Sequence, residues 1–190
     1  MLQIDAMTEV INILSNGGII LYPTDTIWGI GCDASNAQAV EKIYALKDRA
    51  RNKPFVLLAD SLDMVEQHVH HVHPRISTLL QHHVRPLTVV YEQAKNLPPS
   101  VAAQDGSVAI RIAQAGFCQD LIRAYGKPLV ATSANISNQP FPKNFGSISS
   151  DVIQGVDYVV RNNLNLDAQD TEPSVIVRLS PKGELLFLRT

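Results

Sequence analysis

Three clusters of polar and charged side chains could bind or transform a small polar ligand. They are the TDT segment at Thr24–Thr26, the cationic run at Lys47–Lys53 and the TSAN segment at Thr132–Asn135. We interpret all three as lying directly after buried strands, where open α/β sheets place their ligand sites. Hydroxyl and amide groups can recognise a polar ligand, and Lys and Arg bind anions. Phosphate is the first candidate for the bound group.

Each cluster also has a purely structural explanation. Ser, Thr, Asn and Asp bond their own neighbouring backbone in turns and caps, which would account for TDT and TSAN. The cations between Lys47 and Lys53 could form a solvated helix end that favours the macrodipole. The residue types alone leave these alternatives open. The sequence contains no GxxxxGK[ST], GxGxxG or GxSxG motif, which disfavours the standard nucleotide-binding and hydrolase scaffolds.

A histidine-rich segment, HVHHVH, spans His68 to His73 and is followed by the pair His82 and His83. Metal binding is the chemistry that such a cluster suggests. However, no Cys or paired carboxylate accompanies these histidines at ligand spacing, and adjacent pairs would point to different faces of a helix. We therefore expect an exposed helix surface there and no metal site in the protein.

Apolar periodicity predicts the elements that must position these clusters. Helical spacing indicates helices at residues 7–14, 39–44 and 117–125, and two more within 62–84, interrupted at Pro74. Short apolar runs indicate strands at 19–22, 55–59, 87–91, 108–112, 129–132, 158–160, 175–179 and 185–188. The last two are joined by the turn residues SPKGE and should be antiparallel. The sequence therefore predicts an α/β fold with a mixed sheet flanked by helices.

Composition sets the class of protein. The chain has 190 residues, of which 45% are hydrophobic and 18% charged, as in an ordinary globular domain. Two cysteines cannot form a disulfide framework, which fits a reducing compartment. The N-terminus MLQIDAMTEV lacks the features of a signal peptide, and no long apolar stretch follows. We expect a cytoplasmic protein without a membrane segment. The net charge of -2 disfavours extensive nucleic-acid wrapping but leaves a local basic cleft open.

Six segments in chain order make the sequence similar to the YrdC-like threonylcarbamoyl-AMP synthases. They are YPTDTIWGIGCD, AVEKIYALKDRARNKP, PLT, GSVAIRI, GKPLVATSANIS and PSVIV. The pairing of Lys47 and Arg49 with Ser133 and Asn135 is the most specific part of the resemblance. It implies a single domain over residues 1–190, built as a twisted α/β sheet with a concave basic cavity.

The resemblance also implies an activity. The family makes threonylcarbamoyl-AMP and pyrophosphate from L-threonine, bicarbonate and ATP. ATP would be a substrate, and Mg²⁺ would arrive on the nucleotide because it keeps several waters and uses phosphate ligands. Other proteins of tRNA threonylcarbamoylation would be partners, whereas direct contact with RNA is left open.

Two sets of site residues follow from the resemblance. The threonine set is Thr26, Arg111, the backbone around Ala131, and Ser174. The nucleotide set is Lys47, Arg49, Lys53, Ser107, Ser133, Asn135 and Arg189. Lys47 and Arg49 are also expected to be catalytic, because the nucleophile and its target are both anionic. In a continuing helix these two cations would diverge by roughly 200°, so joint action requires the chain to leave its helix there.

Several positions depart from the family pattern and leave other functions open. They are the HHVRPLT segment, Ala113 and Gly116 in place of prolines, Val175, and Leu58 where some relatives carry a histidine. These departures affect the selectivity for the substrate side chain. One alternative is a paralogous enzyme that uses another amino acid or carbamoyl compound. A second is a non-catalytic RNA-binding or ribosome-associated module.

Overall fold

The computed structural model describes residues 2–114, 116–160 and 173–190, with side chains described from residue 7 onward. The helices are α1 (Leu2–Ser15), α2 (Ala37–Leu46), α3 (Leu62–His68), α4 (Pro74–His82), α5 (Phe117–Tyr125) and α6 (Ser150–Gly155), with 3₁₀ turns η1 (Pro99–Val101) and η2 (Phe145–Ser147). The strands are β1 (Ile20–Pro23), β2 (Trp28–Gly31), β3 (Val56–Ala59), β4 (Leu87–Tyr91), β5 (Val108–Ile112), β6 (Leu129–Ser133), β7 (Tyr158–Val159), β8 (Val175–Leu179) and β9 (Leu185–Arg189).

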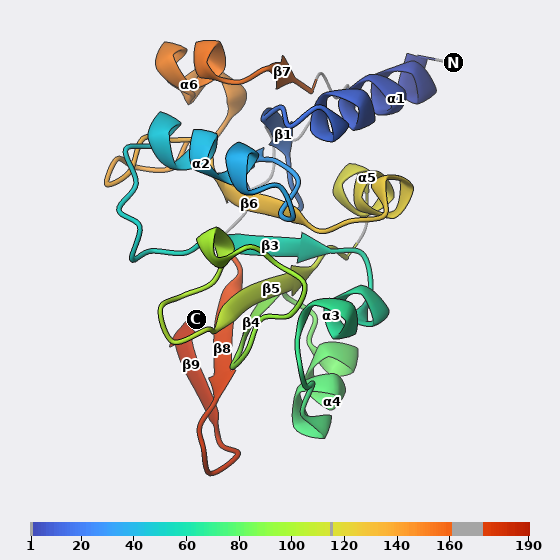
Figure 1. The fold of residues 1–190 in the computed structure, drawn as a ribbon, viewed down its shortest axis with the longest axis vertical. Coiled ribbons are helices and arrows are strands. Elements are labelled where there is room, and N and C mark those ends of the chain that lie inside the picture. Colours follow the sequence, from blue (N-terminus) through green and yellow to red (C-terminus); the bar gives the residue numbers. More distant parts are fainter. Residues whose placement is uncertain (1, 115, 161–172) are drawn as a thin grey trace.

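The described strands form one mixed sheet in the order β7-β1-β2-β6-β3-β5-β4-β8-β9 (Figure 1). Three neighbouring pairs are parallel, β1 with β7, β3 with β5, and β4 with β8, and the other pairs are antiparallel. Strands β8 and β9 form the predicted C-terminal hairpin, whose turn contains Gly183 at a φ of 77°. The predicted α/β fold with a mixed sheet flanked by helices is confirmed.

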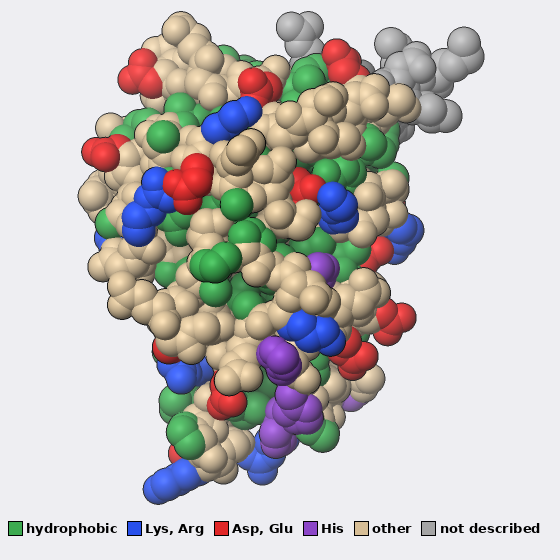
Figure 2. Space-filling view, viewed as in Figure 1, with side chains coloured by type: hydrophobic (Ala, Val, Ile, Leu, Met, Phe, Trp, Pro, Cys, Tyr) green, Lys and Arg blue, Asp and Glu red, His purple; other side chains and the backbone are tan. Residues whose placement is uncertain are grey.

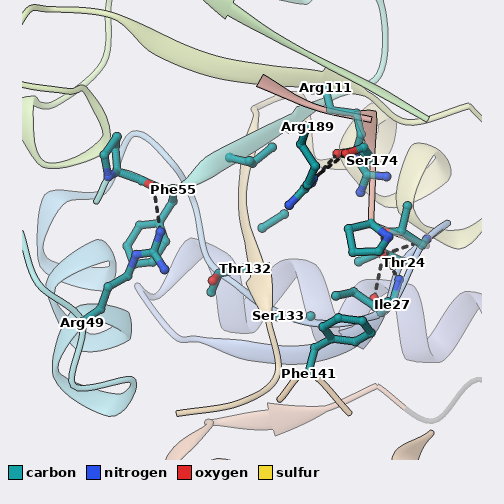
Figure 3. Close-up of a pocket in the computed structure, with 16 residues that line it drawn as sticks. Thr24, Ile27, Arg49, Phe55, Arg111, Thr132, Ser133, Phe141, Ser174 and Arg189 are labelled. Atoms are coloured by element: carbon teal, nitrogen blue, oxygen red, sulfur yellow. Dashed lines mark hydrogen bonds between the residues drawn. The ribbon is translucent and has the colours of Figure 1, made fainter. Parts of the chain in front are cut away.

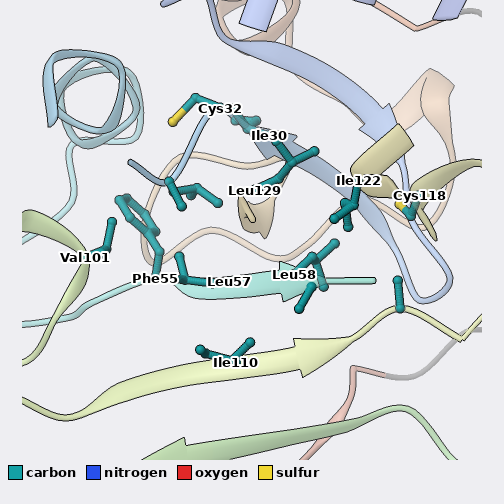
Figure 4. Packing of buried hydrophobic residues seen from close by; sticks show 14 of the residues in the cluster. Ile30, Cys32, Phe55, Leu57, Leu58, Val101, Ile110, Cys118, Ile122 and Leu129 are labelled. Carbon is teal, nitrogen blue, oxygen red and sulfur yellow. The ribbon is translucent and has the colours of Figure 1, made fainter. Parts of the chain in front are cut away.

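Local sequence signals explain where the principal helices begin and end. The Asn36 side chain caps α2 by accepting hydrogen bonds from the backbone N–H groups of Gln38 and Ala39. Helix α5 ends at Gly126, which has a φ of 76° that favours glycine. Both helices bury one apolar face, and their residues join those of the central strands in a continuous core (Figure 4).

Strand β2 was not among the predicted strands, because two of its four residues are glycines, which weaken strand propensity. Packing explains at least one of them. A Cβ on Gly31 would lie 2.5 Å from the Val130 carbonyl oxygen and 2.7 Å from the Tyr22 ring. Close approach of β1, β2 and β6 therefore requires glycine where local propensity disfavours a strand. Helix α6 was also not predicted.

Two expectations about chain geometry were wrong. The cationic run follows α2 rather than a buried strand, and it leads into β3. The HVHHVH segment is not a helix surface, because α3 ends at His68 and Val69 instead forms a β-bridge with Ala94. Pro74 begins α4 as its first residue, where its missing N–H costs nothing.

Candidate active site

A cavity of about 240 Å³ opens where the turn after β1, the end of β6 and the segments around β8 and β9 meet (Figure 3). Its walls combine hydroxyls, cations and apolar groups. The lining residues are Thr24, Thr26, Ile27, Gly29, Arg49, Pro54, Phe55, Val56, Arg111, Ala131, Thr132, Ser133, Phe141, Pro173, Ser174 and Arg189. Residues far apart in the sequence thus face one space.

The β1–β2 turn is held by the hydroxyl of Thr24. Its Oγ1 accepts hydrogen bonds from the N–H groups of Thr26 and Ile27 and donates to the Ile27 carbonyl at 2.7 Å. The two threonine hydroxyl oxygens are 2.9 Å apart. Because the single Thr24 proton goes to Ile27, the Thr26 hydroxyl must be the donor between them. The lone pairs of Thr26 are then free to accept from a ligand.

Arg111 is the one cation of the threonine set, and its side chain is 4% exposed. It pairs with Asp25, whose Oδ1 lies 2.8 Å from Arg111 Nη1. This contact is an ion pair and does not have the geometry of a hydrogen bond. Among the described residues, Arg111 Nη1 and both carboxylate oxygens of Asp25 have no hydrogen-bond partner. Nη1 is thus held against Asp25, and the part of the guanidinium that lines the cavity is the part suited to binding a ligand carboxylate.

Ser174 is positioned by two neighbours from different strands. Its Oγ lies 2.7 Å from the Thr88 hydroxyl, and Arg189 donates to it through Nη2 at 3.2 Å. Arg189 also donates to the Ser174 carbonyl through Nε at 2.8 Å. These bonds tie the start of β8 to β4 and β9, and Figure 3 shows Arg189 and Ser174 together on one wall.

Lys47 occupies the C-terminal end of α2 and is almost fully enclosed, at 1% exposed. Its Nζ donates to the backbone carbonyls of Ser133 and Asn135, and its own carbonyl accepts from the Ser137 N–H at 2.8 Å. Burial, and to a smaller degree the charge of Arg49, lowers the pKa of Lys47 to about 7. Lys47 therefore joins the cationic run to the TSAN segment.

Arg49 is half-buried and stacks over the Phe55 ring at 4.9 Å. It donates through Nε to the Lys53 carbonyl and through Nη2 to the Pro54 carbonyl. Desolvation lowers its pKa below the ordinary arginine value. Between Lys47 and Arg49, Asp48 has a φ of 46°, so the chain leaves the helix at this point as predicted.

An adjoining cavity of about 250 Å³ lies beside the first and shares Arg49 and Ser133 with it. It is lined by Lys47, Asp48, Arg49, Ala50, Lys53, Ser133, Asn135, Ser137 and Asn138. The structure therefore brings Lys47 and Arg49 together with Ser133 and Asn135 around one space.

The predicted site residues are mostly assembled by the fold. All four of the threonine set line the first cavity: Thr26, Arg111, Ala131 and Ser174. Of the nucleotide set, the first cavity takes Arg49, Ser133 and Arg189, and the adjoining one takes Lys47, Arg49, Lys53, Ser133 and Asn135. Ser107 lines neither cavity, and its hydroxyl donates to Asp105 at 2.6 Å.

Sequence reasoning missed several residues that shape the first cavity. Thr24 lies in the TDT segment and Thr132 in the TSAN segment, and both segments were recognised as polar clusters. Other residues of these segments were chosen as site residues in their place. Thr88 lies in the PLT segment, and only its contact with Ser174 shows why a hydroxyl is there. Phe141 is 44% exposed at the cavity mouth, and no pattern pointed to it.

Two further features bear on the class of protein. Among the residues that the structure describes, no group of three or more His, Cys, Asp or Glu side chains is arranged to hold a metal ion. Within the same ranges, every helix is too short or too polar to cross a bilayer.

Comparison with known proteins is consistent with this arrangement. The Sua5/YciO/YrdC family model, described as telomere recombination, matches residues 12–190. A threonylcarbamoyl-AMP synthase of Pseudoalteromonas translucida (strain TAC 125) is 32% identical over 169 residues, 87% of this chain and 89% of that protein. The crystal structure of P. abyssi Sua5 complexed with L-threonine has a TM-score of 0.84 at 22% identity. Full-length HypF, in a phosphate- and nucleotide-bound form, has a TM-score of 0.83 at 21% identity.

The two structural likenesses establish the fold. They cover 96% and 97% of this chain but only 53% of Sua5 and 28% of HypF, so this chain spans about half of the former and less than a third of the latter. The family model and the curated relative extend over most of the chain at higher similarity. The chain belongs to the Sua5/YciO/YrdC family.

Proposed function

We propose that this chain is an L-threonylcarbamoyladenylate synthase, which makes threonylcarbamoyl-AMP and pyrophosphate from L-threonine, bicarbonate and ATP. One observation carries the proposal: the whole predicted threonine set and part of the predicted nucleotide set line a single cavity. A shared cavity is what a reaction between the two substrates requires, because proximity supplies much of the rate. The naming of the 32%-identical relative supports the same activity.

Threonine would bind in the buried half of the cavity. Arg111 would take the carboxylate through the part of its guanidinium that lines the cavity, while Nη1 stays against Asp25. Thr26 would accept from the amine through its free lone pairs, as its own proton goes to Thr24. Ser174 and the backbone at Ala131 would complete the set. P. abyssi Sua5, crystallised with L-threonine, shares this fold.

The nucleotide would extend toward the adjoining cavity. Lys47, Arg49, Lys53, Ser133 and Asn135 surround that space. Phosphate oxygens would replace the carbonyls that now accept from Lys47 and Arg49, because an anionic acceptor makes the stronger hydrogen bond. Arg189 would contact the nucleotide from the first cavity, which it lines together with Ser174. Ser107 is assigned to the nucleotide on resemblance alone.

The chemistry follows from the charges involved. The threonine amine adds to the bicarbonate carbon and water leaves, which gives a carbamate anion. A carbamate oxygen then attacks the α-phosphorus of ATP, the bond to the β-phosphate bridge breaks, and pyrophosphate departs. No general base is needed at this second step, because the attacking oxygen is already anionic. Lys47 and Arg49 would reduce the repulsion between two anions and stabilise the leaving group.

The remaining assignments are part of the same proposal. Mg²⁺ would arrive on the nucleotide, because it favours substrate phosphates and retained waters over a dedicated protein cage. The product would pass to other proteins of tRNA threonylcarbamoylation, with direct RNA contact left open. We also propose a cytoplasmic location, because a step that uses ATP and serves tRNA modification fits that compartment.

One assay separates the candidate functions. The purified chain is incubated with Mg²⁺, ATP, bicarbonate and each amino acid in turn, and pyrophosphate release is measured alongside mass spectrometry of the nucleotide product. We expect release that depends on both threonine and bicarbonate, with threonylcarbamoyl-AMP as the product. Release with a different amino acid would identify a paralogous enzyme. No amino-acid-dependent release would contradict the proposal.

A further inference from the structure

The ammonium group of Lys47 is an enclosed cation beside the adjoining cavity of the candidate active site. Lysine usually keeps this group in water, and Figure 2 shows Lys and Arg side chains standing out from one face of the molecule. Among the residues that the structure describes, Lys47 is the one buried lysine, at 1% exposed. A buried ammonium needs oxygens around it in place of water. The nature of these oxygens indicates what else the same space could hold.

Three uncharged oxygens face this ammonium. Its Nζ donates to the backbone carbonyls of Ser133 and Asn135, and the side-chain oxygen Oδ1 of Asn135 lies 3.5 Å from it. We call these three oxygens the carbonyl nest. Backbone carbonyls can replace the hydration shell of K⁺, and neutral oxygens suit a monovalent ion better than a divalent one. A divalent site of His, Cys, Asp or Glu side chains does not occur within the described ranges.

The carbonyl nest is held in shape by bonds that do not involve Lys47. The side-chain nitrogen of Asn135 donates to the carbonyls of Ile136 at 3.1 Å and Gln139 at 2.6 Å. Both amide hydrogens are therefore used, and Oδ1 is left to face the ammonium. The backbone N–H of Asn135 also donates to the Ser133 carbonyl at 2.9 Å, which fixes this turn. The nest would keep its shape if the ammonium left it.

Lys47 gains by leaving the nest for a polyphosphate. Burial, and to a smaller degree the charge of Arg49, lowers the pKa of Lys47 to about 7. An anionic phosphate oxygen stabilises the charged ammonium more than neutral carbonyls do. Its departure would leave the oxygens of the nest turned toward a space without a cation, which costs free energy. A free cation of the same charge would recover that loss.

The charges around the adjoining cavity decide when a free cation can enter. Besides Lys47, the cavity is lined by the cations Arg49 and Lys53 and by the carboxylate of Asp48. With the Lys47 ammonium in the nest, a further cation would be repelled. A polyphosphate brings more negative charge than these side chains bring positive charge once Lys47 is paired with it, so a cation would then be attracted. Occupation of the nest by a free ion is therefore tied to a bound anion.

We propose that the carbonyl nest is a binding site for K⁺, which the Lys47 ammonium occupies in this structure and a free ion occupies once a nucleotide draws Lys47 to its phosphates. The lysine ammonium stands in for the free ion, because both are single positive charges that carbonyl dipoles can hold. Water and phosphate oxygens in the adjoining cavity would complete the coordination. The exchange rests on the proposed function, because it needs a bound nucleotide, whereas the nest itself does not.

Lys47→Met tests the nest without any nucleotide, because Met keeps an apolar stem but ends short of the ammonium. Melting temperatures are measured in KCl, NH₄Cl and choline chloride at one concentration, and the differences seen in the wild-type chain are subtracted. We expect K⁺ and NH₄⁺ to raise the melting temperature of the variant by about 2–4 °C relative to choline, which is too large for the nest.

Lys42→Met is the matched control, because the exposed Lys42 ammonium donates to a single carbonyl, that of Gly17. It should show no cation-specific rise. If Lys47→Met melted at the same temperature in all three salts, the nest would not bind a free cation and the proposal would be overturned. A rise of equal size in Lys42→Met would also overturn it, because the effect would then be general.

Calorimetric titration of the wild-type chain with MgATP tests the exchange. The affinity for ATP should be about threefold or more higher in KCl than in choline chloride, since two ligands linked through Lys47 must strengthen each other. L-Threonine, which requires no movement of Lys47, should bind equally well in both salts. Equal ATP affinities in the two salts would overturn the exchange. Absence of ATP binding in both would contradict the proposed function together with the exchange, while the melting temperatures of Lys47→Met would still decide the nest.

Discussion

The two halves of the candidate active site are built in different ways. The half around Arg111 and Ser174 rests on strands, and its groups are oriented by one another and by enclosed neighbours such as Thr88 and Asp25. The half around Lys47 and Arg49 lies on a segment between a helix and a strand, and its cations donate to backbone carbonyls. The first half is ready for a ligand, whereas the second must exchange internal partners for one.

This difference suggests a division of labour. Rigid positioning suits recognition of a small amino acid, where discrimination depends on a fixed set of hydrogen bonds. Cations that donate to neutral carbonyls are suited to binding a polyphosphate, because a phosphate oxygen is a stronger, anionic acceptor and can replace the carbonyl. When pyrophosphate leaves, the cations can return to the carbonyls. The predictions below test whether the halves behave in these separate ways.

The largest expected effect is on stability in the rigid half. Arg111→Ala leaves the Asp25 carboxylate buried without its counter-ion, and breaking such a pair typically costs about 3–5 kcal/mol of unfolding free energy. Adding Asp25→Asn removes the unpaired charge and should restore a substantial part of that loss. Urea denaturation of the two single variants and the double variant measures their unfolding free energies. If the loss in the double variant equalled the sum of the two single losses, Arg111 and Asp25 would not be coupled.

Arg49→Ala should affect rate rather than stability. Removing one preorganised donor of this kind typically lowers turnover by roughly a hundredfold or more. Its other contacts are two backbone carbonyls and the Phe55 ring, so the unfolding free energy should fall by no more than about 1–2 kcal/mol. Arg51→Ala is the matched control, since Arg51 is a neighbouring exposed cation paired with Glu41 outside both cavities. A stable, fully active Arg49→Ala chain would remove this cation from the mechanism.

Ser174→Ala should have a moderate effect confined to threonine. It removes the hydroxyl that bonds Thr88 and Arg189, and one neutral hydrogen bond is worth about three- to tenfold in binding. We expect the KM for threonine to rise by that factor while the KM for ATP stays within about twofold. Equal increases in both constants would indicate a displaced hairpin rather than a lost contact.

Lys47 gives a signal of a different kind, a change in the number of bound protons. Its pKa is about 7 when folded and roughly 10.4 in an unfolded chain, so the unfolded state holds the proton more tightly. Stability should therefore rise with pH between about 7 and 10 and be independent of this group below that window. Lys47→Met should abolish this rise in denaturation experiments, and an unchanged pH dependence would contradict the assignment.

The same group makes nucleotide binding pH-dependent. A polyphosphate beside Nζ favours the charged lysine, so ATP binding near pH 7.5 should take up about half a proton or more. Calorimetry in buffers of different ionisation enthalpy measures this uptake. A wild-type chain that binds ATP without it would mean that Lys47 does not meet the phosphates.

Much of the fold could be predicted from local signals that agree with the tertiary structure. Asn36 and Gly126 cap helices as their types indicate, and the apolar runs of β4, β5 and β8 lie where they were expected. Strand β2 could not be predicted, because its glycines disfavour a strand locally. Glycine is required at position 31 by the close approach of Val130 and Tyr22, which are not its neighbours in the sequence. The HVHHVH helix failed because Val69 pairs with Ala94 instead.

The sequence predicted most of the polar residues that gather around the two cavities, but it did not predict the bonds among them. The resemblance supplied Lys47 and Arg111, and the structure places both at cavities. That Lys47 is enclosed by two carbonyls, and that Arg111 faces Asp25, depends on contacts between segments far apart in the chain. Phe141 carried no sequence signal because an aromatic in a loop has no periodicity to reveal its neighbours.

Separate titration of the two substrates tests the division of labour most directly. Calorimetry is run with L-threonine and with ATP on the wild-type chain, on Arg111→Lys and on Arg49→Ala. Arg111→Lys keeps the charge beside Asp25 but loses the two-point fork. We predict that Arg111→Lys weakens threonine by about tenfold or more and leaves ATP nearly unchanged, while Arg49→Ala does the reverse. If each variant weakened both ligands equally, the two halves would not be distinct sites and the account would be contradicted.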